Sequence, residues 1–429
     1  MKVLIAGGGI GGLATALSLH AVGIEAEVFE QARELREVGV GINTLPHAVK
    51  ELATLGLLSG LDRVGIRTSE LIYMSRLGQT VWQELRGMDA GYDTPQFSIH
   101  RGKLLGLLHQ AALERLGSAQ IHTDHRLVGF DERADRIVAR FERRDGGERI
   151  EAAGDALIGA DGIHSAVRSA FYPDEGSPIW SGMMGWRGAT EWPIYRDGQT
   201  MVIAGGNAAK FVFYPIHADP AKPDTRLTNW GIMARIGDGT KPPPRREDWS
   251  RPGRLDEVLS LVRDKFRLGF TEPEALIEAT ETFYEYPNCD RDPLPRWSFG
   301  RVTLLGDAAH PMYPNGSNGA GQAILDARRL AAHLTSCTSV AEALAAYDAE
   351  RRPATAAIVL SNRRGGPEGV IDVVEARAPH GFDDIDKVAS YAEREAIVRG
   401  YASLAGYAKD QVNTRGGPVR AERQRKGRT

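Results

Sequence analysis

The first 30 residues constrain the fold more than any other stretch of the chain. A short apolar run, Lys2–Ala6, leads into the segment Gly7–Gly12 (GGGIGG), which satisfies the spacing G-x-G-x-x-G. Apolar residues then recur at helical spacing over Ile10–Val22, and Ala26–Glu30 (AEVFE) is typical of a second strand. Strand, glycine turn, helix and strand in this order predict a βαβ unit with parallel strands.

The glycines and the acidic residue that follows them predict a bound adenosine dinucleotide. Gly7 allows a tight turn, Gly9 lets a pyrophosphate approach the backbone, and Gly12 lets helix and strand pack closely. The N–H groups of the helix that begins at Ile10 favour a phosphate. Glu30 follows Gly12 by 18 residues, a spacing typical of a carboxylate that binds ribose hydroxyls and repels a 2′-phosphate. The alternative is a plain glycine turn beside an exposed glutamate.

Composition excludes several other classes of protein. The formal charge is −3 in 429 residues, so we expect neither nucleic acid nor a membrane as a partner. Cys289 and Cys337 belong to no CxxC or Cys/His cluster, so we expect no metal site and a reduced, cytoplasmic protein. Lys2 leads directly into the strand without a signal-peptide pattern. Val3–Ile24 holds 22 uncharged residues, but its clustered glycines argue against a membrane span.

Helices and buried strands are expected on both sides of a β-rich middle segment. The expected helices are Pro46–Leu58, Arg101–Leu116 and Gly319–Thr335, and the expected buried strands are Ala156–Ala160 and Arg301–Leu305. Antiparallel hairpins are expected over Glu70–Leu85 and over Leu127–Glu151, the latter with its turn at 145–147. Between Trp180 and Tyr286, short β-like runs alternate with loops rich in proline and charge, and one helix is expected at Leu255–Arg267. We therefore expect a discontinuous nucleotide-binding domain with a second domain inserted into it.

Two further motifs follow expected strands. After the strand at 156–160, Ser165 is placed to cap a short helix, and Arg168 to hold a phosphate or Asp161. After the strand at 301–305, Asp307 can accept a hydrogen bond from a sugar-alcohol hydroxyl. The glycine-rich loop beyond it opens a long helix whose first N–H groups, at Gly319–Gly321, can hold a developing anion. The alternatives are an ordinary Asp-Gly turn and plain helix capping.

In this order, the three motifs resemble those of the class A (single-component) FAD-dependent aromatic monooxygenases. The stretches that carry the resemblance are Gly7–Gly12, Asp161–Arg168 (DGIHSAVR), Gly306–Gln322, Gly39–Ile42, Ser98–Gly102, Trp186–Gly188 and Asp290–Leu294. The resemblance runs from residue 1 to about residue 352. Within the family, the sequence is most similar to the branch that hydroxylates phenazine carboxylates, as in pyocyanin biosynthesis. The salicylate and hydroxynicotinate hydroxylases are more distant likenesses.

The resemblance implies a fold and its division into domains. We expect an α/β protein: a Rossmann-like FAD-binding domain of the glutathione-reductase type, with an inserted β-rich substrate domain and a C-terminal helical region. The FAD-binding domain would comprise residues 1–70, 101–179 and 287–365, and the substrate domain residues 71–100 and 180–286. Residues 366–429 would form the helical region and a basic tail, which we interpret as a solvated end rather than a nucleic-acid arm.

The resemblance also implies contacts to the phosphate and ribose end of FAD. Gly9 and Gly11, with Ile10 between them, would lie against the pyrophosphate, and Glu30 would hold the adenosine ribose. Arg101 would reach the pyrophosphate and ribityl region. Asp161 would lie near the pyrophosphate, in the path of the nicotinamide donor.

A second set of contacts implied by the resemblance surrounds the flavin ring. Asp307 would hold the ribityl chain or the phosphate bridge. Val40 and Gly41 would lie near the isoalloxazine ring. The N–H groups of Ala320 and Gly321 would face the N1–C2=O edge of the ring, where the reduced flavin carries its negative charge.

The activity that the resemblance implies comes from the cofactor. NADH or NADPH would bind transiently, because the chain holds no second G-x-G-x-x-G, and would reduce FAD. Oxygen would then form a C4a-hydroperoxyflavin that hydroxylates an aromatic or N-heteroaromatic substrate, a carboxylic acid or a phenol. Carbon dioxide would leave if the attacked carbon bears a carboxylate. The enzyme is expected to be a monomer or a homodimer.

Four residues are candidates for the substrate side of the site. Pro314 would border the substrate at the flavin face, and Tyr214 would line the pocket from the β-rich domain. Arg187 could pair with a substrate carboxylate or form a structural salt bridge. His47 could be a general base on a substrate hydroxyl, or a surface or capping histidine.

Two other functions are compatible with the same fold. One is a flavin halogenase or a flavin-linked reductase, but the Trp-x-Trp-x-Ile-Pro run of the halogenases is missing from the sequence. The other is a non-enzymatic binding protein, which would have no reason to keep the motifs of Asp161 and Asp307 together.

Overall fold

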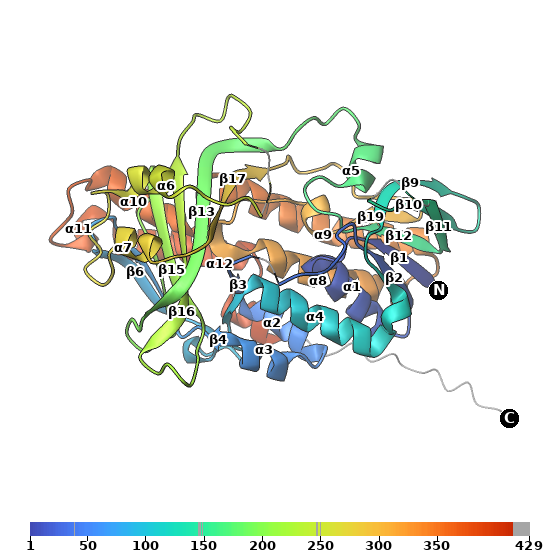
Figure 1. The fold of residues 1–429 in the computed structure, drawn as a ribbon, viewed down its shortest axis with the longest axis horizontal. Helices are drawn as coiled ribbons and strands as arrows, with labels where there is room; N and C mark the ends of the chain where they lie inside the picture. Colours follow the sequence, from blue (N-terminus) through green and yellow to red (C-terminus); the bar gives the residue numbers. More distant parts are fainter. Residues whose placement is uncertain (38, 145–146, 148, 246–247, 249, 415–429) are drawn as a thin grey trace.

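The computed structural model describes the chain except residues 38, 145–146, 148, 246–247, 249 and 415–429 (Figure 1). Among the described residues, six strands form a sheet in the order β18-β19-β12-β1-β2-β8. They are β1 (Lys2–Ala6), β2 (Glu25–Phe29), β8 (Ile121–His122), β12 (Ala156–Gly159), β18 (Ser298–Phe299) and β19 (Val302–Leu304). All neighbours pair in parallel except β18 with β19. The parallel sheet predicted from the βαβ pattern is confirmed.

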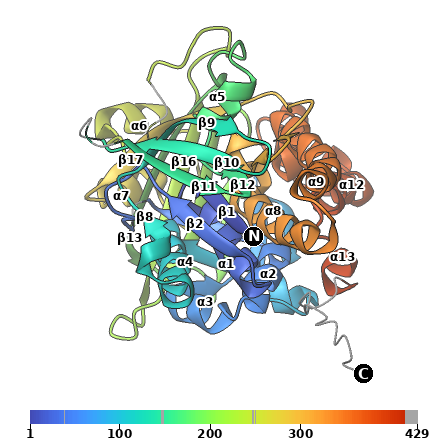
Figure 2. The same ribbon diagram turned by 90° about the vertical axis from the view of Figure 1, so that its right-hand side faces the viewer.

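Both faces of this sheet are covered. Helices α1 (Ile10–Ala21), α4 (Arg101–Leu116) and α8 (Gly319–Ser336) lie on one side, and α9 (Val340–Arg363) packs against α8. The other side carries an antiparallel sheet of β9 (Arg126–Glu132), β10 (Ile137–Glu142) and β11 (Arg149–Gly154), as Figure 2 shows. Apolar residues of β1, β10 and α8 share one core, which holds the N-terminal glycine segment against the edge of the sheet.

A second, larger sheet forms the β-rich part of the molecule. Its order is β17-β13-β16-β15-β14-β5-β6. The strands are β5 (Glu70–Met74), β6 (Thr80–Leu85), β13 (Ile179–Pro193), β14 (Thr200–Ala204), β15 (Ala209–His217), β16 (Thr225–Arg235) and β17 (Phe283–Asp290). One face packs on α6 (Leu255–Val262) and α7 (Pro273–Glu278), and the other on α10 (Gly369–Arg377) and α12 (Tyr391–Leu404). The β-rich insertion and the C-terminal helical region are thus confirmed.

A small sheet connects the two parts. It consists of β3 (Gly41–Thr44), β7 (Phe97–His100) and β4 (Gly65–Arg67), with β7 in the middle. Helices α2 (Pro46–Thr54) and α3 (Leu58–Val64) follow β3, and α4 follows β7 without a break. The remaining helices are α5 (Ala166–Phe171), α11 (Ile385–Val388) and α13 (Lys409–Thr414).

Three expected elements differ from those observed. The single helix expected at Pro46–Leu58 is two helices, because Gly56 adopts φ +72° between α2 and α3. The helix expected at Leu255–Arg267 ends at Val262, shortly before Asp264 with φ +59°. The hairpin expected over Leu127–Glu151 has three strands, and most of its expected turn lies outside the described residues. The basic tail beyond residue 414 also lies outside them.

The described part of the chain contains no helix long and apolar enough to span a membrane. Val3–Ile24 forms a strand, a turn and a helix.

Candidate active site

The glycine segment between β1 and α1 leaves room beside one of its three motif glycines. Gly7 has φ +111°, and a Cβ atom there would lie 2.2 Å from the carbonyl oxygen of Ala160. A Cβ atom on Gly12 would lie 1.9 Å from the carbonyl oxygen of Gly7. Around a Cβ atom on Gly9, by contrast, no other part of the described chain lies within 4 Å. The fold itself requires glycine at the first and third positions, so the open space at Gly9 fits an approaching pyrophosphate.

Gly11 and Ile10 belong to the packing of α1. A Cβ atom on Gly11 would meet side-chain atoms of Leu305 at 3.0 Å and of Ala323 at 3.3 Å. Ile10 is buried in the core that α1 shares with α4 and α8. Gly11 therefore lets α1 approach α8, and the predicted contact of both residues with the pyrophosphate stays a prediction.

The Glu30 carboxylate lies beside the glycine segment. Its Oε2 accepts a hydrogen bond of 2.7 Å from the Gly8 N–H, and its Oε1 accepts one of 2.7 Å from the Ala32 N–H. Each carboxylate oxygen can accept a further bond, and the side chain is partly exposed. The position is compatible with the predicted contact to an adenosine ribose.

The Asp161 motif begins α5. The Ser165 hydroxyl donates to Asp161 Oδ1 at 2.5 Å, and the Ala166 N–H donates to Oδ2 at 2.7 Å. Ser165 also caps the helix, because its Oγ accepts from the Arg168 N–H at 2.9 Å. Burial raises the pKa of Asp161 against the effect of these hydrogen bonds. The predicted cap is confirmed.

Arg168 binds partners other than Asp161, so that alternative is wrong, and its contact with a phosphate stays a prediction. Its buried guanidinium forms an ion pair with Glu175 and donates to the carbonyl oxygens of Ala308 and Ala309 at 3.1 Å and 3.0 Å. Arg168 therefore connects the second motif to the third. Its contacts with Ala308 and Ala309 could not be predicted from the sequence, because these residues lie about 140 positions further along the chain.

Asp307 and Arg101 lie near enough for their charges to interact. Solvent reaches the Asp307 side chain, although protein surrounds it closely. Burial raises the pKa of Asp307, while the charges of His310 and Arg101 act in the opposite direction. Arg101 begins α4, its backbone N–H donates to the Val40 carbonyl at 2.7 Å, and burial lowers the pKa of its guanidinium.

A buried ion network that the sequence analysis missed fixes the turn of Asp307. The Asp326 carboxylate, on α8, binds His310 Nε2 at 2.6 Å and Arg351 Nε at 2.7 Å, and it accepts from the Gly306 N–H at 3.2 Å. Asp326 is fully buried, and its interactions with His310 and Arg351 keep the pKa of its carboxyl below its usual value despite burial. The network connects the Gly-Asp turn to α8 and α9.

The start of α8 lies beside Asp307. The helix begins at Gly319 after Asn318, which does not cap it by its side chain. A Cβ atom on Gly319 would lie 4.0 Å from Asp307 Oδ1. A Cβ atom on Gly321 would lie 3.3 Å from the His47 ring, so glycine lets α8 pack against α2. The first N–H groups of an α-helix have no acceptor within the helix, and the predicted contact of Ala320 and Gly321 with the flavin stays a prediction.

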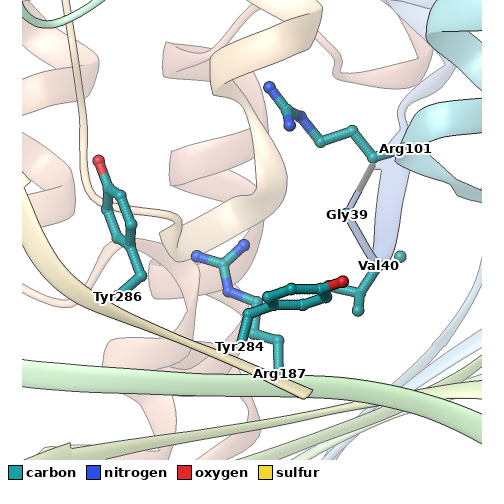
Figure 3. A pocket seen from close by; sticks show the side chains of 7 residues that line it. Gly39, Val40, Arg101, Arg187, Tyr284 and Tyr286 are labelled. Atoms are coloured by element: carbon teal, nitrogen blue, oxygen red, sulfur yellow. The ribbon is translucent and has the colours of Figure 1, made fainter. Parts of the chain in front are cut away.

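A hollow of about 360 Å³ lies beside these segments. It is lined by Gly39, Val40, Gly41, Arg101, Arg187, Tyr284 and Tyr286. Figure 3 shows the side chains of Arg101 and Arg187, which come from the start of α4 and from β13, with Tyr284 and Tyr286 beside Arg187. Burial lowers the pKa of Arg187, and the two guanidinium groups repel each other. Such a pair of cations favours an anionic ligand.

Tyr214 lies behind Gly41 instead of lining the hollow. A Cβ atom on Gly41 would lie 2.6 Å from Tyr214 Cε2 and 2.7 Å from Asn229. The Asn229 side chain also accepts from the Gly41 N–H at 2.7 Å. The two residues support β3 from the β-rich sheet, and the predicted contact of Tyr214 with substrate stays a prediction.

His47 is fully buried, so its interpretation as a surface residue is wrong. Its ring lies 5.7 Å from that of Tyr407, and its Nε2 lies 3.4 Å from Gln322 Nε2. His47 lines neither of the two hollows described here. These contacts favour a positioning role for His47, and its role as a base stays a prediction.

Pro314 precedes the short 3-10 turn Asn315–Ser317, in which Gly316 has φ +69°. Gly316 and Ser317 line a second hollow, which Asn43 of β3 also lines. Glu368 fixes the turn, because its Oε1 accepts from the Gly316 N–H at 3.0 Å. The predicted substrate contact of Pro314 stays a prediction.

We expect Asp307→Asn to change cofactor binding and stability in opposite directions. Losing the charged acceptor should weaken FAD binding by about 10- to 100-fold. The FAD-free variant should be more stable than the FAD-free wild type at pH 7, because burial disfavours the ionised carboxylate. The raised pKa means that this difference should shrink as the pH falls toward about 4, where the unfolded chain also protonates. Flavin titration and urea unfolding at both pH values measure the two effects. An asparagine variant that binds FAD as tightly as the wild type would contradict the assignment.

Comparison with known proteins places this site in a family. The FAD binding domain model matches residues 1–248 and 273–361. The phenazine 1,6-dicarboxylic acid hydroxylase PhzS of Lysobacter antibioticus is 44% identical over 94% of this chain and 96% of its own length. The 3-hydroxybenzoate 6-hydroxylase 1 of Aquipseudomonas alcaligenes is 31% identical over 84% of this chain and 88% of its own. The salicylate hydroxylase of Pseudomonas putida is 33% identical over 82% of each chain.

Solved structures share the fold. Klebsiella pneumoniae HpxO, complexed with FAD and uric acid, superposes with a TM-score of 0.71 at 24% identity, covering 94% of this chain and 96% of that chain. The resemblance in sequence to the FAD-dependent aromatic monooxygenases is confirmed. The open space at Gly9, the Asp307 carboxylate and the uncapped start of α8 fit a bound FAD. The chain belongs to the FAD binding domain family, and within it to the FAD-dependent monooxygenases that hydroxylate aromatic compounds.

Proposed function

We propose that the enzyme uses NADH or NADPH and O₂ to hydroxylate an aromatic or N-heteroaromatic acid, with a phenazine carboxylate as the first candidate substrate. The 44% identity over almost the whole length of a phenazine 1,6-dicarboxylic acid hydroxylase is the observation that carries this proposal. The relatives named for 3-hydroxybenzoate and salicylate also act on aromatic acids.

FAD, when bound, accepts a hydride from the nicotinamide and activates oxygen. The protein itself binds and orients the cofactor and the substrate and shields them from water. Gly9 leaves space for the pyrophosphate, and Glu30 and Asp307 offer carboxylate oxygens to hydroxyl groups of the cofactor. The N–H groups at the start of α8 stabilise negative charge that develops beside them.

The walls of the two hollows keep water from the reacting groups. Tyr214 is buried behind β3, and apolar residues of β5 and β14 line the second hollow. Excluding water prevents loss of activated oxygen as peroxide, so substrate oxidation follows donor oxidation. If the attacked carbon bears a carboxylate, hydroxylation releases it as CO₂. The proposed state of assembly is a monomer or a homodimer.

A substrate screen tests the proposed function. The FAD-loaded enzyme is given NADH or NADPH with phenazine-1-carboxylate, 3-hydroxybenzoate, salicylate or phenol. We expect phenazine-1-carboxylate to stimulate donor oxidation most, with hydroxylated product formed and little peroxide released. If no aromatic acid or phenol stimulated donor oxidation, the proposal would be refuted. A compound that stimulates donor oxidation but yields only peroxide, detected with catalase, and no hydroxylated product is an effector and not a substrate.

A further inference from the structure

The second hollow contains a buried cation that the proposed function has not used. Arg86 is only 7% exposed and lines the hollow, and its Nε has no hydrogen-bond partner among the described residues. One other nitrogen of the guanidinium pairs with Glu84 at 2.9 Å, and Tyr407 lies against the group. A buried guanidinium N–H that lacks an acceptor is costly, so an acceptor supplied by a ligand would be bound strongly.

A second polar group in the same hollow is also incompletely bonded. Gln96 is 2% exposed, and its side-chain Oε1 has no donor within the described chain. Glu368, the carboxylate that lines the hollow, is already bound by Lys210 and by the Gly316 N–H. Glu368 is therefore bound elsewhere, and Glu84 pairs with a different nitrogen of Arg86, so the Nε–H still lacks an acceptor. A ligand that satisfies this hollow carries an acceptor, most strongly a carboxylate, and at another point a hydrogen-bond donor.

The remaining walls are apolar and aromatic. They are formed by Leu45, Leu71, Tyr73, Met201, Ile203 and Tyr407. Apolar and aromatic walls with a few convergent polar groups are typical of small-molecule sites.

The hollow also lies where a substrate of this enzyme must lie. Asn43 and Leu45 line it from the end of β3, the strand that starts at Gly41 in the first hollow. Gly316 and Ser317 line it from the loop that leads into α8. The sequence analysis predicts that Val40 and Gly41, at the start of this strand, lie near the flavin ring and that Pro314, in this loop, borders the substrate.

We infer that Arg86 binds the carboxylate of the aromatic substrate and that Gln96 accepts a hydrogen bond from a donor on its ring. This inference rests on the proposed function, and it assigns to Arg86 the role that the sequence analysis considered for Arg187. Arg187 lies with Arg101 in the first hollow. Arg86 is thus a residue that determines specificity for acids over neutral analogues.

Two ligands that differ only in charge test the inference. The dissociation constants of phenazine-1-carboxylate and phenazine-1-carboxamide are measured on the FAD-loaded enzyme by perturbation of the flavin spectrum, which requires no turnover. In Arg86→Gln we expect the carboxylate to bind at least about 30-fold more weakly and the carboxamide to change less than about threefold. Arg394→Gln is the matched control, because Arg394 is also 7% exposed, donates to the Ala389 and Val81 carbonyl oxygens and lines neither hollow; it should keep the wild-type preference for the carboxylate.

Several results would overturn the inference. The inference fails if the wild type binds the carboxylate and the carboxamide equally, or if Arg86→Gln weakens the binding of both ligands by the same factor. It also fails if Arg187→Gln removes the preference for the carboxylate and Arg86→Gln does not. If Arg86→Gln fails to fold, Arg86→Lys serves instead, and it should weaken carboxylate binding because the ammonium cannot replace the Nε–H. If Arg86→Lys bound the carboxylate as tightly as the wild type does, that result would contradict the assigned role of Arg86. Failure of the proposed function is distinct, because it appears in the wild type as donor oxidation that no acid stimulates.

Discussion

Replacing Gly9 by valine is expected to abolish FAD retention and to leave the fold intact. The backbone of Gly9 is extended, with φ −71° and ψ −175°, which valine adopts readily. No other part of the described chain lies within 4 Å of an added Cβ atom. The side chain would occupy the space in which the pyrophosphate approaches the backbone. We expect FAD affinity to fall at least about 100-fold and the FAD-free protein to lose no more than about 1 kcal/mol of stability.

Gly12→Val is the matched control for this prediction. Its Cβ atom would lie 1.9 Å from the Gly7 carbonyl oxygen, so this variant should lose at least about 2 kcal/mol of unfolding free energy together with FAD. Flavin absorbance after purification and urea unfolding of the FAD-free proteins separate the two cases. A Gly9→Val protein that purifies yellow with full FAD content would show that the cofactor does not pass this glycine.

The difference between these two glycines also explains which parts of the fold could be predicted from the sequence. The role of Gly12 is local, since an added Cβ atom would meet the backbone of Gly7 in the same βαβ unit, and Gly7 needs glycine already for its φ of +111°. Glycine spacing and helical periodicity therefore sufficed for β1, α1 and the turn between them. Helix ends were harder to predict: α2 stops before Gly56, in a stretch whose apolar spacing continues to Leu58.

The rest of the site depends on contacts between distant parts of the chain. Arg168 meets Ala308 and Ala309, 140 and 141 residues away, and no local pattern reports such a pairing. Asn229 was missed for the same reason, since it reaches Gly41 from another sheet. Asp326 left a signal, because it is an acidic residue inside the otherwise uncharged helix start GAGQAILDA. A lone carboxylate on a buried helix face requires a partner.

The second large effect is expected from Asp326→Asn. The change keeps the shape of the side chain but removes the charge that binds Arg351 at 2.7 Å and His310 at 2.6 Å. Removing one partner of a buried ion pair leaves an uncompensated charge, so the FAD-loaded enzyme should lose about 3–5 kcal/mol of unfolding free energy. The Asp307 turn should loosen as well, because the Gly306 N–H bonds to the same carboxylate. Urea unfolding at a fixed FAD concentration measures the stability change.

Glu350→Gln provides the control, since Glu350 on α9 also pairs with α8, through Arg329 at 2.6 Å, but both side chains are largely exposed. Its loss should cost no more than about 1 kcal/mol. The fold lowers the pKa of Asp326, so the ionised carboxylate stabilises the protein above about pH 4, where the residue is also ionised in the unfolded chain. This stabilisation is lost as the pH falls further. The difference in unfolding free energy between wild type and Asp326→Asn should therefore become smaller in acid. Equal losses from the two substitutions at pH 7 would mean that the buried network does not fix the Asp307 turn, and that α8 and α9 are held by apolar packing alone.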